Sequence, residues 1–355
     1  MTTDDGMLDE AYERLHAKGP EFNGWLSNHG PMAVDALLRL GRSSDVHRWV
    51  VSYERRLEPM PGARWAITDD EWRDPLGDPS RLGDWLAFLT RQVHEEPWQQ
   101  VLARWWPRLL PGAVASSTHG LIRTGHVVRA LRDAVTQARL DELGQALGYW
   151  AARWQPLPGG RGANGALDAG AALDAGAALD ALPPAGVGVG GGARTRLAAL
   201  GADPAWLPAL AGHRSPASVA DVPVALDELT DAAVSRYPRW AGANPVMLVH
   251  TATAPRAVAL VLPSLPVGLW PASYEGAWAV AAAITAAYRP VSSAVVDAPG
   301  EESDVATLDV SGLLSRNDDE HVVKFLEVAV ESQRRGNADA ATAARRAVSL
   351  IGETG

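Results

Sequence analysis

Lys324 is one of only two lysines in this chain of 355 residues, and its neighbours make it the first candidate for chemistry. It lies in the segment DEHVVKFLEV (319–328), which surrounds it with apolar residues if the segment is helical. Burial of an ammonium is costly, so it lowers the pKa of the amine and favours the neutral form. A neutral amine can form a Schiff base, act as a general base, or add carbon dioxide to become a carbamate that binds a metal. Pairing with Glu327, or extension to solvent, would instead give Lys324 a structural role.

The histidines are the second set of candidates, and they fall into two groups by context. The first group lies among charged or turn residues, as is typical of surface histidines: His16, His47, His94 and His213. The second group lies beside glycines or apolar residues, where an imidazole either binds a metal or packs in the core. This group comprises His29, His119, His126, His250 and His321.

His119 and His126 lie seven residues apart in STHGLIRTGHVVRAL, so a helix places them two turns apart on one face. This spacing is wider than the i, i+4 histidine pair of zinc proteases. Arg123 is one turn from each of them and could hold a phenolate or carboxylate of a substrate. It could equally anchor a backbone carbonyl or an acidic side chain.

The composition excludes several kinds of chemistry. The chain has no cysteine, which excludes disulfides, thiolate nucleophiles, zinc-thiolate sites and iron-sulfur clusters. The formal net charge of -10 argues against a nucleic-acid partner or an anionic membrane surface. The N-terminus is acidic, and the longest run of small apolar residues, 277–288, is too short to cross a bilayer. We therefore expect a cytoplasmic protein whose metal ligands, if any, are histidines or oxygens.

The elements that would position these residues are predicted to be helices. Asn28 and Pro31 mark a helix start and Gly41 its end, with apolar residues at helical spacing between them. The same periodicity recurs in PSRLGDWLAFLTRQV, in EPWQQVLARWWPRLL and through 118–154, and strand-like alternation is scarce. Further helices are expected around 195 and over 224–235, 246–262, 276–287 and 319–335. We predict a mostly α, multi-helical globular fold with most of the fourteen tryptophans in its core.

The composition changes sharply between residues 156 and 193. The unit ALDAGA recurs there before a glycine run, and neither its period nor its glycine content favours a stable helix. We interpret 156–193 as a flexible low-complexity linker between an N-terminal lobe (1–155) and a C-terminal lobe (194–355). Gly186, Gly188 and Gly191 match G-x-G-x-x-G, but no strand precedes them, so dinucleotide binding is not predicted.

Five motifs in a fixed order resemble the questin oxidase-like family, and the resemblance extends over most of the chain outside the linker. They are NHGPM (28–32), HGLIRTGH (119–126), YWAARWQPLP (149–158), VHT (249–251) and HVVK (321–324). The segment SSTHGLIRTGH is the most specific of them. The resemblance implies a single domain over 1–355 that acts as an oxygenase. Members of this family use molecular oxygen for Baeyer-Villiger-like ring opening of anthraquinones in fungal polyketide metabolism.

The resemblance also implies a mononuclear non-haem iron(II) with His29, His119, His126, His250 and a carboxylated Lys324 as ligands. His321 would support these ligands or exchange roles with one of them, and Arg123 would hold the substrate. Such a site would join both lobes around one ion and leave a position open for oxygen or substrate. The expected substrate is an aromatic polyketide, and NADPH is implied by the resemblance alone. The linker and the compact length depart from the fungal members, so the identity of the substrate does not transfer.

Two other classes of function fit parts of the sequence. A hydrolase with a carbamate-bridged metal pair would use the same lysine, but it also needs H-x-H and carboxylate ligands on barrel strands, which the sequence lacks. A non-catalytic, helical small-molecule-binding protein would explain the tryptophans and the apolar helix faces. That alternative predicts no bound metal and tolerance of Lys324→Arg.

Overall fold

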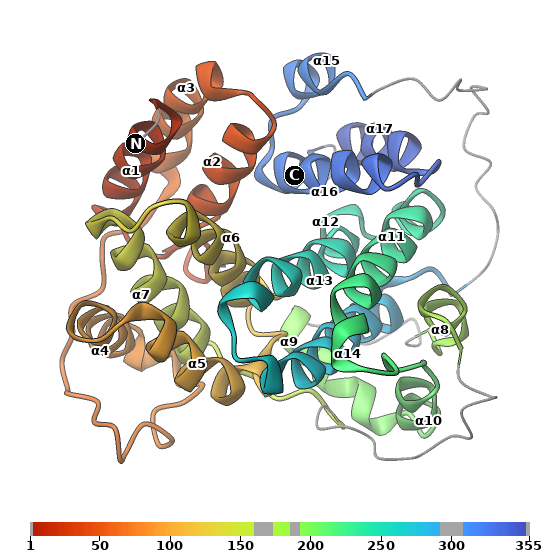
Figure 1. Cartoon of the computed structure of the whole chain (residues 1–355), viewed down its shortest axis with the longest axis horizontal. Helices are drawn as coiled ribbons and strands as arrows, with labels where there is room; N and C mark the ends of the chain where they lie inside the picture. Colours follow the sequence, from red (N-terminus) through yellow and green to blue (C-terminus); the bar gives the residue numbers. More distant parts are fainter. Residues whose placement is uncertain (1–2, 160–172, 185–191, 292–307, 353–355) are drawn as a thin grey trace. The chain divides into compact units, whose positions relative to one another are not determined.

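The fold was determined as a computed structural model that describes residues 3–159, 173–184, 192–291 and 308–352. These residues are mostly helical, as predicted (Figure 1). Strand structure within them is limited to β1 (Glu21–Phe22) and β2 (Leu26–Ser27), which pair antiparallel. The turn between the two strands places Asn23 and Gly24 at positive φ, which these two residue types tolerate best.

The chain forms two compact units, each described here by itself. Unit 1 comprises Met1–Pro156 and Ala257–Trp270, and unit 2 comprises Leu157–Arg256 and Pro271–Gly355. The first boundary lies one residue from the end of the predicted N-terminal lobe. Residues 257–270 lie within the predicted C-terminal lobe (194–355), but they belong to unit 1.

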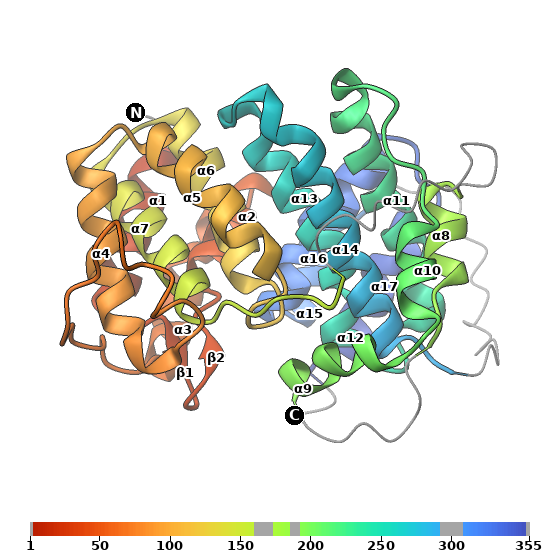
Figure 2. The same ribbon diagram turned by 90° about the horizontal axis from the view of Figure 1, so that it is seen from below.

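Unit 1 is built from seven α-helices and short 3₁₀ turns in its described part. The α-helices are α1 (Thr3–His16), α2 (Gly30–Arg39), α3 (Ser43–Tyr53), α4 (Leu82–Glu95), α5 (Trp98–Leu109), α6 (His119–Asp133) and α7 (Gln137–Ala152). The 3₁₀ turns are η1 (Glu54–Arg56), η2 (Pro79–Arg81), η3 (Leu110–Gly112), η6 (Leu262–Ser264) and η7 (Val267–Leu269). Helices α4 and α6 pack on α7, and α1, α2 and α3 pack on one another (Figures 1 and 2).

The predicted signals explain where α2 begins and ends. Pro31 lies in its first turn, and Gly41, at φ +71°, follows its end. The long periodic segment 118–154 divides into α6 and α7, because the Thr136 side chain accepts a hydrogen bond from the backbone N–H of Arg139 and caps the second helix.

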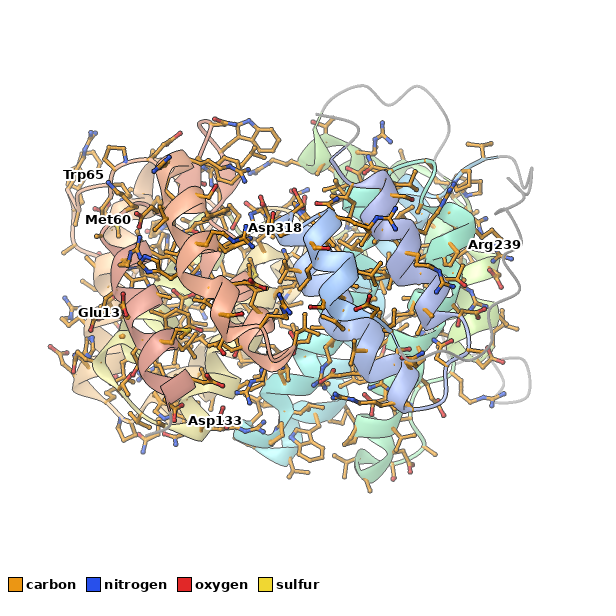
Figure 3. The ribbon with its side chains drawn as sticks, turned by 90° about the horizontal axis from the view of Figure 1, so that it is seen from above. Glu13, Met60, Trp65, Asp133, Arg239 and Asp318 are labelled. Atoms are coloured by element: carbon orange, nitrogen blue, oxygen red, sulfur yellow. The ribbon has the colours of Figure 1, made fainter. Side chains whose placement is uncertain are left out.

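The core of unit 1 is rich in tryptophan, as expected. Trp85 packs edge to face on Trp105, and Trp106 on Trp150, with ring centroids 5.6 Å apart in both pairs. Trp25 and Trp65 are exceptions, because both are exposed. The side chains of Trp65 and of the exposed Met60 point away from the helices of the unit (Figure 3).

Unit 2 has its own helical core. Its described helices are α8 (Ala175–Ala181), α9 (Ala193–Ala198), α10 (Trp206–Ala211), α11 (Val222–Trp240), α12 (Pro245–Leu248), α14 (Trp270–Tyr288), α15 (Val310–Arg316), α16 (Glu320–Arg334) and α17 (Ala340–Leu350), with the 3₁₀ turns η4 (Ala199–Ala202) and η5 (Val219–Asp221). Helix α13 (His250–Val261) begins in unit 2 and ends in unit 1. Helices α11, α16 and α17 pack on one another and bury the apolar face of the segment that carries Lys324.

Residues 173–184 correct the prediction that the whole of 156–193 is a flexible linker. Part of the repeat forms α8, whose start is capped by the Asp174 side chain. Leu179 is fully buried, and the Asp180 carboxylate pairs with two arginines of α11. Burial of the repeat's leucines and pairing of its aspartate thus offset the low helix propensity of its glycines. The three glycines of the G-x-G-x-x-G match lie outside the described residues.

Within the described ranges, one helical stretch, Pro245–Ser264, is long and apolar enough to cross a membrane by length and composition. However, 78% of its most apolar window is buried inside the fold, which is typical of a core helix.

Candidate metal centre and buried lysine

Two imidazoles of unit 1 face each other at the starts of two packed helices. His29 is the residue directly before α2, and His119 is the first residue of α6. Their Nε2 atoms lie 2.7 Å apart, the rings are edge to face, and both residues are buried. Metal–nitrogen distances near 2.0–2.1 Å place two ligating nitrogens about 3 Å apart. A small separation of the two rings would therefore admit one ion between them.

The hydrogen bond at the other ring nitrogen fixes the tautomer of His119. Its Nδ1 lies against the backbone carbonyl of Ser116. A carbonyl oxygen can only accept, so Nδ1–H donates and Nε2 carries the lone pair that faces His29. His29 is held through its backbone, because its N–H donates to the Tyr53 hydroxyl at 2.6 Å.

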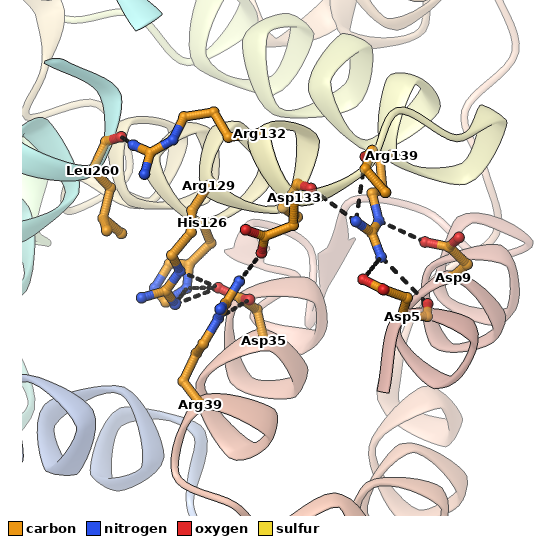
Figure 4. Close-up of polar contacts among 12 residues, drawn as sticks. Asp5, Asp9, Asp35, Arg39, His126, Arg129, Arg132, Asp133, Arg139 and Leu260 are labelled. Atoms are coloured by element: carbon orange, nitrogen blue, oxygen red, sulfur yellow. Dashed lines mark hydrogen bonds and ion pairs between the residues drawn. The ribbon is translucent and has the colours of Figure 1, made fainter. Parts of the chain in front are cut away.

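His126 lies two turns further along α6, about 10 Å from His119. Its Nδ1 is 2.8 Å from Oδ2 of Asp35, a buried carboxylate of α2 that also binds Arg129 and Arg39 (Figure 4). Burial alone would raise the pKa of Asp35, but Arg129 and the hydrogen bond from His126 hold that pKa below its usual value. The ionised carboxylate orients the His126 ring and leaves Nε2 as its outward nitrogen.

Arg123 has a structural partner in unit 1. Its guanidinium binds Glu142 through two hydrogen bonds of 2.5 and 2.7 Å, and both side chains are fully buried. Gln145 accepts a third, longer bond. Burial would raise the pKa of Glu142, but Arg123 and then His16 lower it below its usual value. The Glu142 carboxylate already accepts hydrogen bonds from Nε and one Nη of Arg123, the pair of donors that a substrate anion would need. The geometry therefore favours a role of Arg123 in anchoring Glu142 over a role in substrate binding.

Lys324 lies in α16 of unit 2 and is only 1% exposed. Its Nζ has no hydrogen-bond partner in the part of the chain that the structure describes, so neither pairing with Glu327 nor extension to solvent is seen. Burial lowers the pKa of the amine to about 7, an effect that Glu320 and Asp319 partly oppose. A large fraction of Lys324 is therefore neutral near physiological pH, as the sequence predicts.

Two histidines of unit 2 are related to Lys324. His321 lies three residues before it in α16, and His250 is affected by its charge. His250 opens α13 and its ring lies 5.5 Å from that of His321, centroid to centroid. Burial, followed by the charges of Lys324 and His321, lowers the pKa of His250 well below its usual value, so its imidazole is neutral. The ligand atoms of Asp319, Glu320 and His321 lie within 4.8 Å of one another and could also hold an ion.

Four of the five histidines in the candidate group, namely three predicted ligands and His321, share the hydrogen-bond pattern of metal-bound imidazoles. In metal sites the ring nitrogen away from the metal usually donates to a carbonyl or carboxylate. Nδ1 of His119 and of His250 lies at a backbone carbonyl, that of Ser116 and of Met247. The corresponding nitrogen of His126 and of His321 lies at a carboxylate, that of Asp35 and of Asp319.

Two of the predicted surface histidines show a different pattern, because Nε2 of His16 faces Glu142 and that of His94 faces Asp141. The prediction was wrong for His213, which is buried against Trp278. Its Nδ1 lies at the Leu210 carbonyl and its Nε2 faces Glu275, so a carbonyl at Nδ1 also occurs in a histidine outside the predicted ligand set. Sequence reasoning missed Asp35 as the partner of His126. The signal was present, because Asp35 is the single carboxylate in the otherwise apolar run MAVDALL of a predicted helix.

Trp150 and Trp154, the two tryptophans of the YWAARWQPLP motif, are packing residues. The Trp150 indole N–H donates to the Gly112 carbonyl, and the Trp154 ring fills the space beside Gly112. Trp25 is 58% exposed after the hairpin turn.

A comparison with known protein families finds no family that matches this chain, and a comparison with curated proteins finds no match. The resemblance to the questin oxidase-like family therefore rests on the five sequence motifs. The case for a function rests on the chemistry of the residues described above.

Proposed function

We propose that the protein is a non-haem iron oxygenase of the questin oxidase-like type, which uses molecular oxygen to open a ring of an aromatic polyketide. The observation that carries the proposal is Lys324, a buried amine with a pKa near 7 and no hydrogen bond among the described residues. A buried polar group without a partner is costly, and a charged amine is among the most costly groups to bury. A packing role for Lys324 would be better served by an apolar residue.

The donor set suits iron. The ligands that the resemblance implies are His29, His119 and His126 of unit 1 and His250 and Lys324 of unit 2. Imidazole and oxygen ligands favour iron over the softer metals that thiolates select. The bound iron(II) would supply the activation of dioxygen. Held Nδ1–H groups on three of these histidines support the assignment, because they leave Nε2 as the ligating atom.

Lys324 would bind the ion through oxygen after it reacts with carbon dioxide. The neutral amine attacks the carbon, a nitrogen–carbon bond forms, and one proton leaves to give a carbamate anion. His321 lies one turn before Lys324 on α16, and its Nδ1–H is held by Asp319. Its Nε2 can take up the released proton. In this proposal His321 prepares the ligand and has no contact with the substrate.

The ring opening requires a reductant. Insertion of one oxygen atom beside a ring carbonyl leaves the second oxygen atom to be reduced to water by two electrons and two protons. NADPH is the donor that the resemblance implies. We further propose that the protein acts in the cytoplasm, where NADPH and carbon dioxide are both supplied.

The test is oxygen consumption by iron-loaded protein with hydroxylated anthraquinones and NADPH. Wild-type protein and Lys18→Met, which changes the exposed second lysine, should both be active. Lys324→Met and Lys324→Arg should be inactive, because neither side chain can form a carbamate. Full activity of Lys324→Arg would contradict the proposal and favour a role as a binding protein or a metal-free enzyme.

A further inference from the structure

Three consecutive residues directly before His119 have left-handed backbone conformations. The φ angles are +45° at Ser116, +55° at Ser117 and +72° at Thr118. Such conformations are strained for residues with a Cβ, and they normally occur singly. Asn23 is the one other non-glycine residue with positive φ in the described chain. Most of this kind of strain is therefore concentrated in one turn.

The rest of the chain shows how this strain is usually avoided. Other left-handed positions carry glycine, as at Gly41, Gly77 and Gly336, where no Cβ opposes the conformation. Ser116, Ser117 and Thr118 each have a Cβ, so the left-handed conformation is strained at all three positions. Strain that persists without glycine tends to mark functional positions, where the surrounding structure holds the conformation.

The turn determines which way the Ser116 carbonyl points. That oxygen accepts the backbone N–H of His119 at 3.3 Å and also the Nδ1–H of its ring. The Thr118 carbonyl then accepts the N–H of Ile122 and begins the regular bonding of α6. The left-handed run thus turns the Ser116 carbonyl onto the imidazole. With Nδ1–H bound there, Nε2 faces Nε2 of His29 at 2.7 Å.

Close packing on both sides holds the turn in place. A Cβ on Gly120 would lie 2.5 Å from Trp150, and one on Gly112 would lie 2.3 Å from Trp154. Thr118 itself is fully buried. The chain on either side of the turn is thus packed tightly against a tryptophan.

We infer that the Ser116–Thr118 turn is a positioning device, whose strain is retained because it fixes His119 as the Nδ1–H tautomer and directs Nε2 at a divalent cation shared with His29. The role of the cation rests on the proposed function, whereas the backbone strain and the tautomer of His119 follow from the structure alone. Ser116, Ser117 and Thr118 are positioning residues that act through His119.

The experiment compares Ser117→Gly with wild type by three measurements: the melting temperature, cobalt(II) affinity from the visible spectrum, and the His119 tautomer from ¹⁵N NMR of histidine-labelled protein. Ser117→Gly should raise the melting temperature because the strain is relieved. It should also weaken cobalt binding by about tenfold or more, as is usual when the support of a ligand is lost, and populate the second tautomer of His119.

Two control variants accompany this comparison. Asn23→Gly, which relieves the same kind of strain in the hairpin, should leave cobalt affinity and the His119 tautomer unchanged. Ser117→Asn, which tolerates the left-handed region, should retain wild-type affinity.

A Ser117→Gly protein with wild-type cobalt affinity and an unmixed Nδ1–H tautomer would overturn the inference while leaving the proposed function intact. Absence of cobalt binding by wild type would count against the proposed function instead. The NMR measurement would then still decide the inference, because a mixed tautomer of His119 in the wild type would overturn it.

Discussion

Lys324 and Arg123 are both buried basic residues, but their surroundings differ. Arg123 binds Glu142 through two hydrogen bonds, whereas Nζ of Lys324 has no hydrogen-bond partner within the described residues. A guanidinium stays charged at any accessible pH and so requires its partner, but an amine can lose its proton. The sequence left both roles open for each residue. Only the tertiary neighbours, which come from other helices, could assign a structural role to Arg123 and favour a chemical role for Lys324.

Stability should depend on pH through Lys324. Below pH 7 both the folded and the unfolded chain carry the proton, so the folded protein bears the full cost of a buried charge. Between pH 7 and about 10.5 only the unfolded chain holds the proton, so stability rises with pH. Lys324→Met removes this dependence. The difference in unfolding free energy between wild type and variant should therefore shift in favour of the wild type by roughly 4–5 kcal/mol across this window.

Urea unfolding of both proteins between pH 6 and 10 measures this difference. A difference that does not change with pH would mean that Lys324 keeps its charge in the folded state. It would then also lack the neutral amine that carbamate formation requires.

The Arg123–Glu142 pair should behave as a structural unit. Glu142→Gln alone should lower the unfolding free energy by about 3–5 kcal/mol, because it leaves a buried guanidinium without its counter-charge. The double variant Arg123→Met/Glu142→Leu should lose much less, since apolar residues of similar size can replace a buried pair. Chemical denaturation of the single and double variants measures the coupling. If the double variant lost as much stability as the sum of the single changes, the two residues would not act as a unit. A rise in KM of the single variant without a loss of stability would indicate that Arg123 binds substrate.

Helix boundaries were the most predictable feature at the scale of elements, because their signals are local. Pro31 and Gly41 correctly bracket α2, while the break between α6 and α7 depends on a single cap at Thr136. The error over α8 has a tertiary cause. A repeat of alanine, glycine and leucine has no reason to form a helix until Leu179 is buried and Asp180 meets Arg236 and Arg239.

The contact between α6 and α7 should not tolerate a methyl group at Gly120. A Cβ there would lie 2.5 Å from Trp150, so Gly120→Ala should separate the helices and destabilise the fold by about 1–3 kcal/mol. Gly6→Ala in α1, where no atom lies within 4 Å of the added Cβ, should instead stabilise it by about 0.5–1 kcal/mol. Thermal unfolding of the two variants provides the comparison. Equal effects would contradict the described packing of α6 on Trp150.

Asp180 should tie α8 to α11. Asp180→Asn removes the charge that Arg236 and Arg239 share, and each partly exposed pair contributes about 0.2–1 kcal/mol. Global stability should therefore change little, while α8 should open locally more often. Limited proteolysis followed by mass spectrometry should show faster cleavage within 173–184 in the variant than in wild type. Unchanged cleavage would mean that the burial of Leu179 is sufficient to hold the helix.

For the whole molecule, the sequence predicts the fold class and the boundary near residue 156, but it does not predict that residues 257–270 belong to unit 1. Helical periodicity is a property of neighbouring residues, so a mostly helical fold follows from the sequence. The boundary at 256–257 falls inside the continuous helix α13, where composition gives no signal. The same limit applies to the candidate site, because the sequence supplies the histidines but not the Ser116 and Met247 carbonyls or the Asp35 carboxylate that orient them.

Iron binding by imidazoles and the buried Lys324 underlies the whole proposed function, and the metal content of the protein tests it. The measurement is elemental analysis of wild type, Lys18→Met and Lys324→Met after anaerobic loading with iron(II) and bicarbonate and removal of free metal. We predict about one iron per chain in wild type and Lys18→Met, and a loss of most of it in Lys324→Met. Wild-type protein that retains no iron, or a Lys324→Met variant that retains as much as wild type, would rule out this iron site.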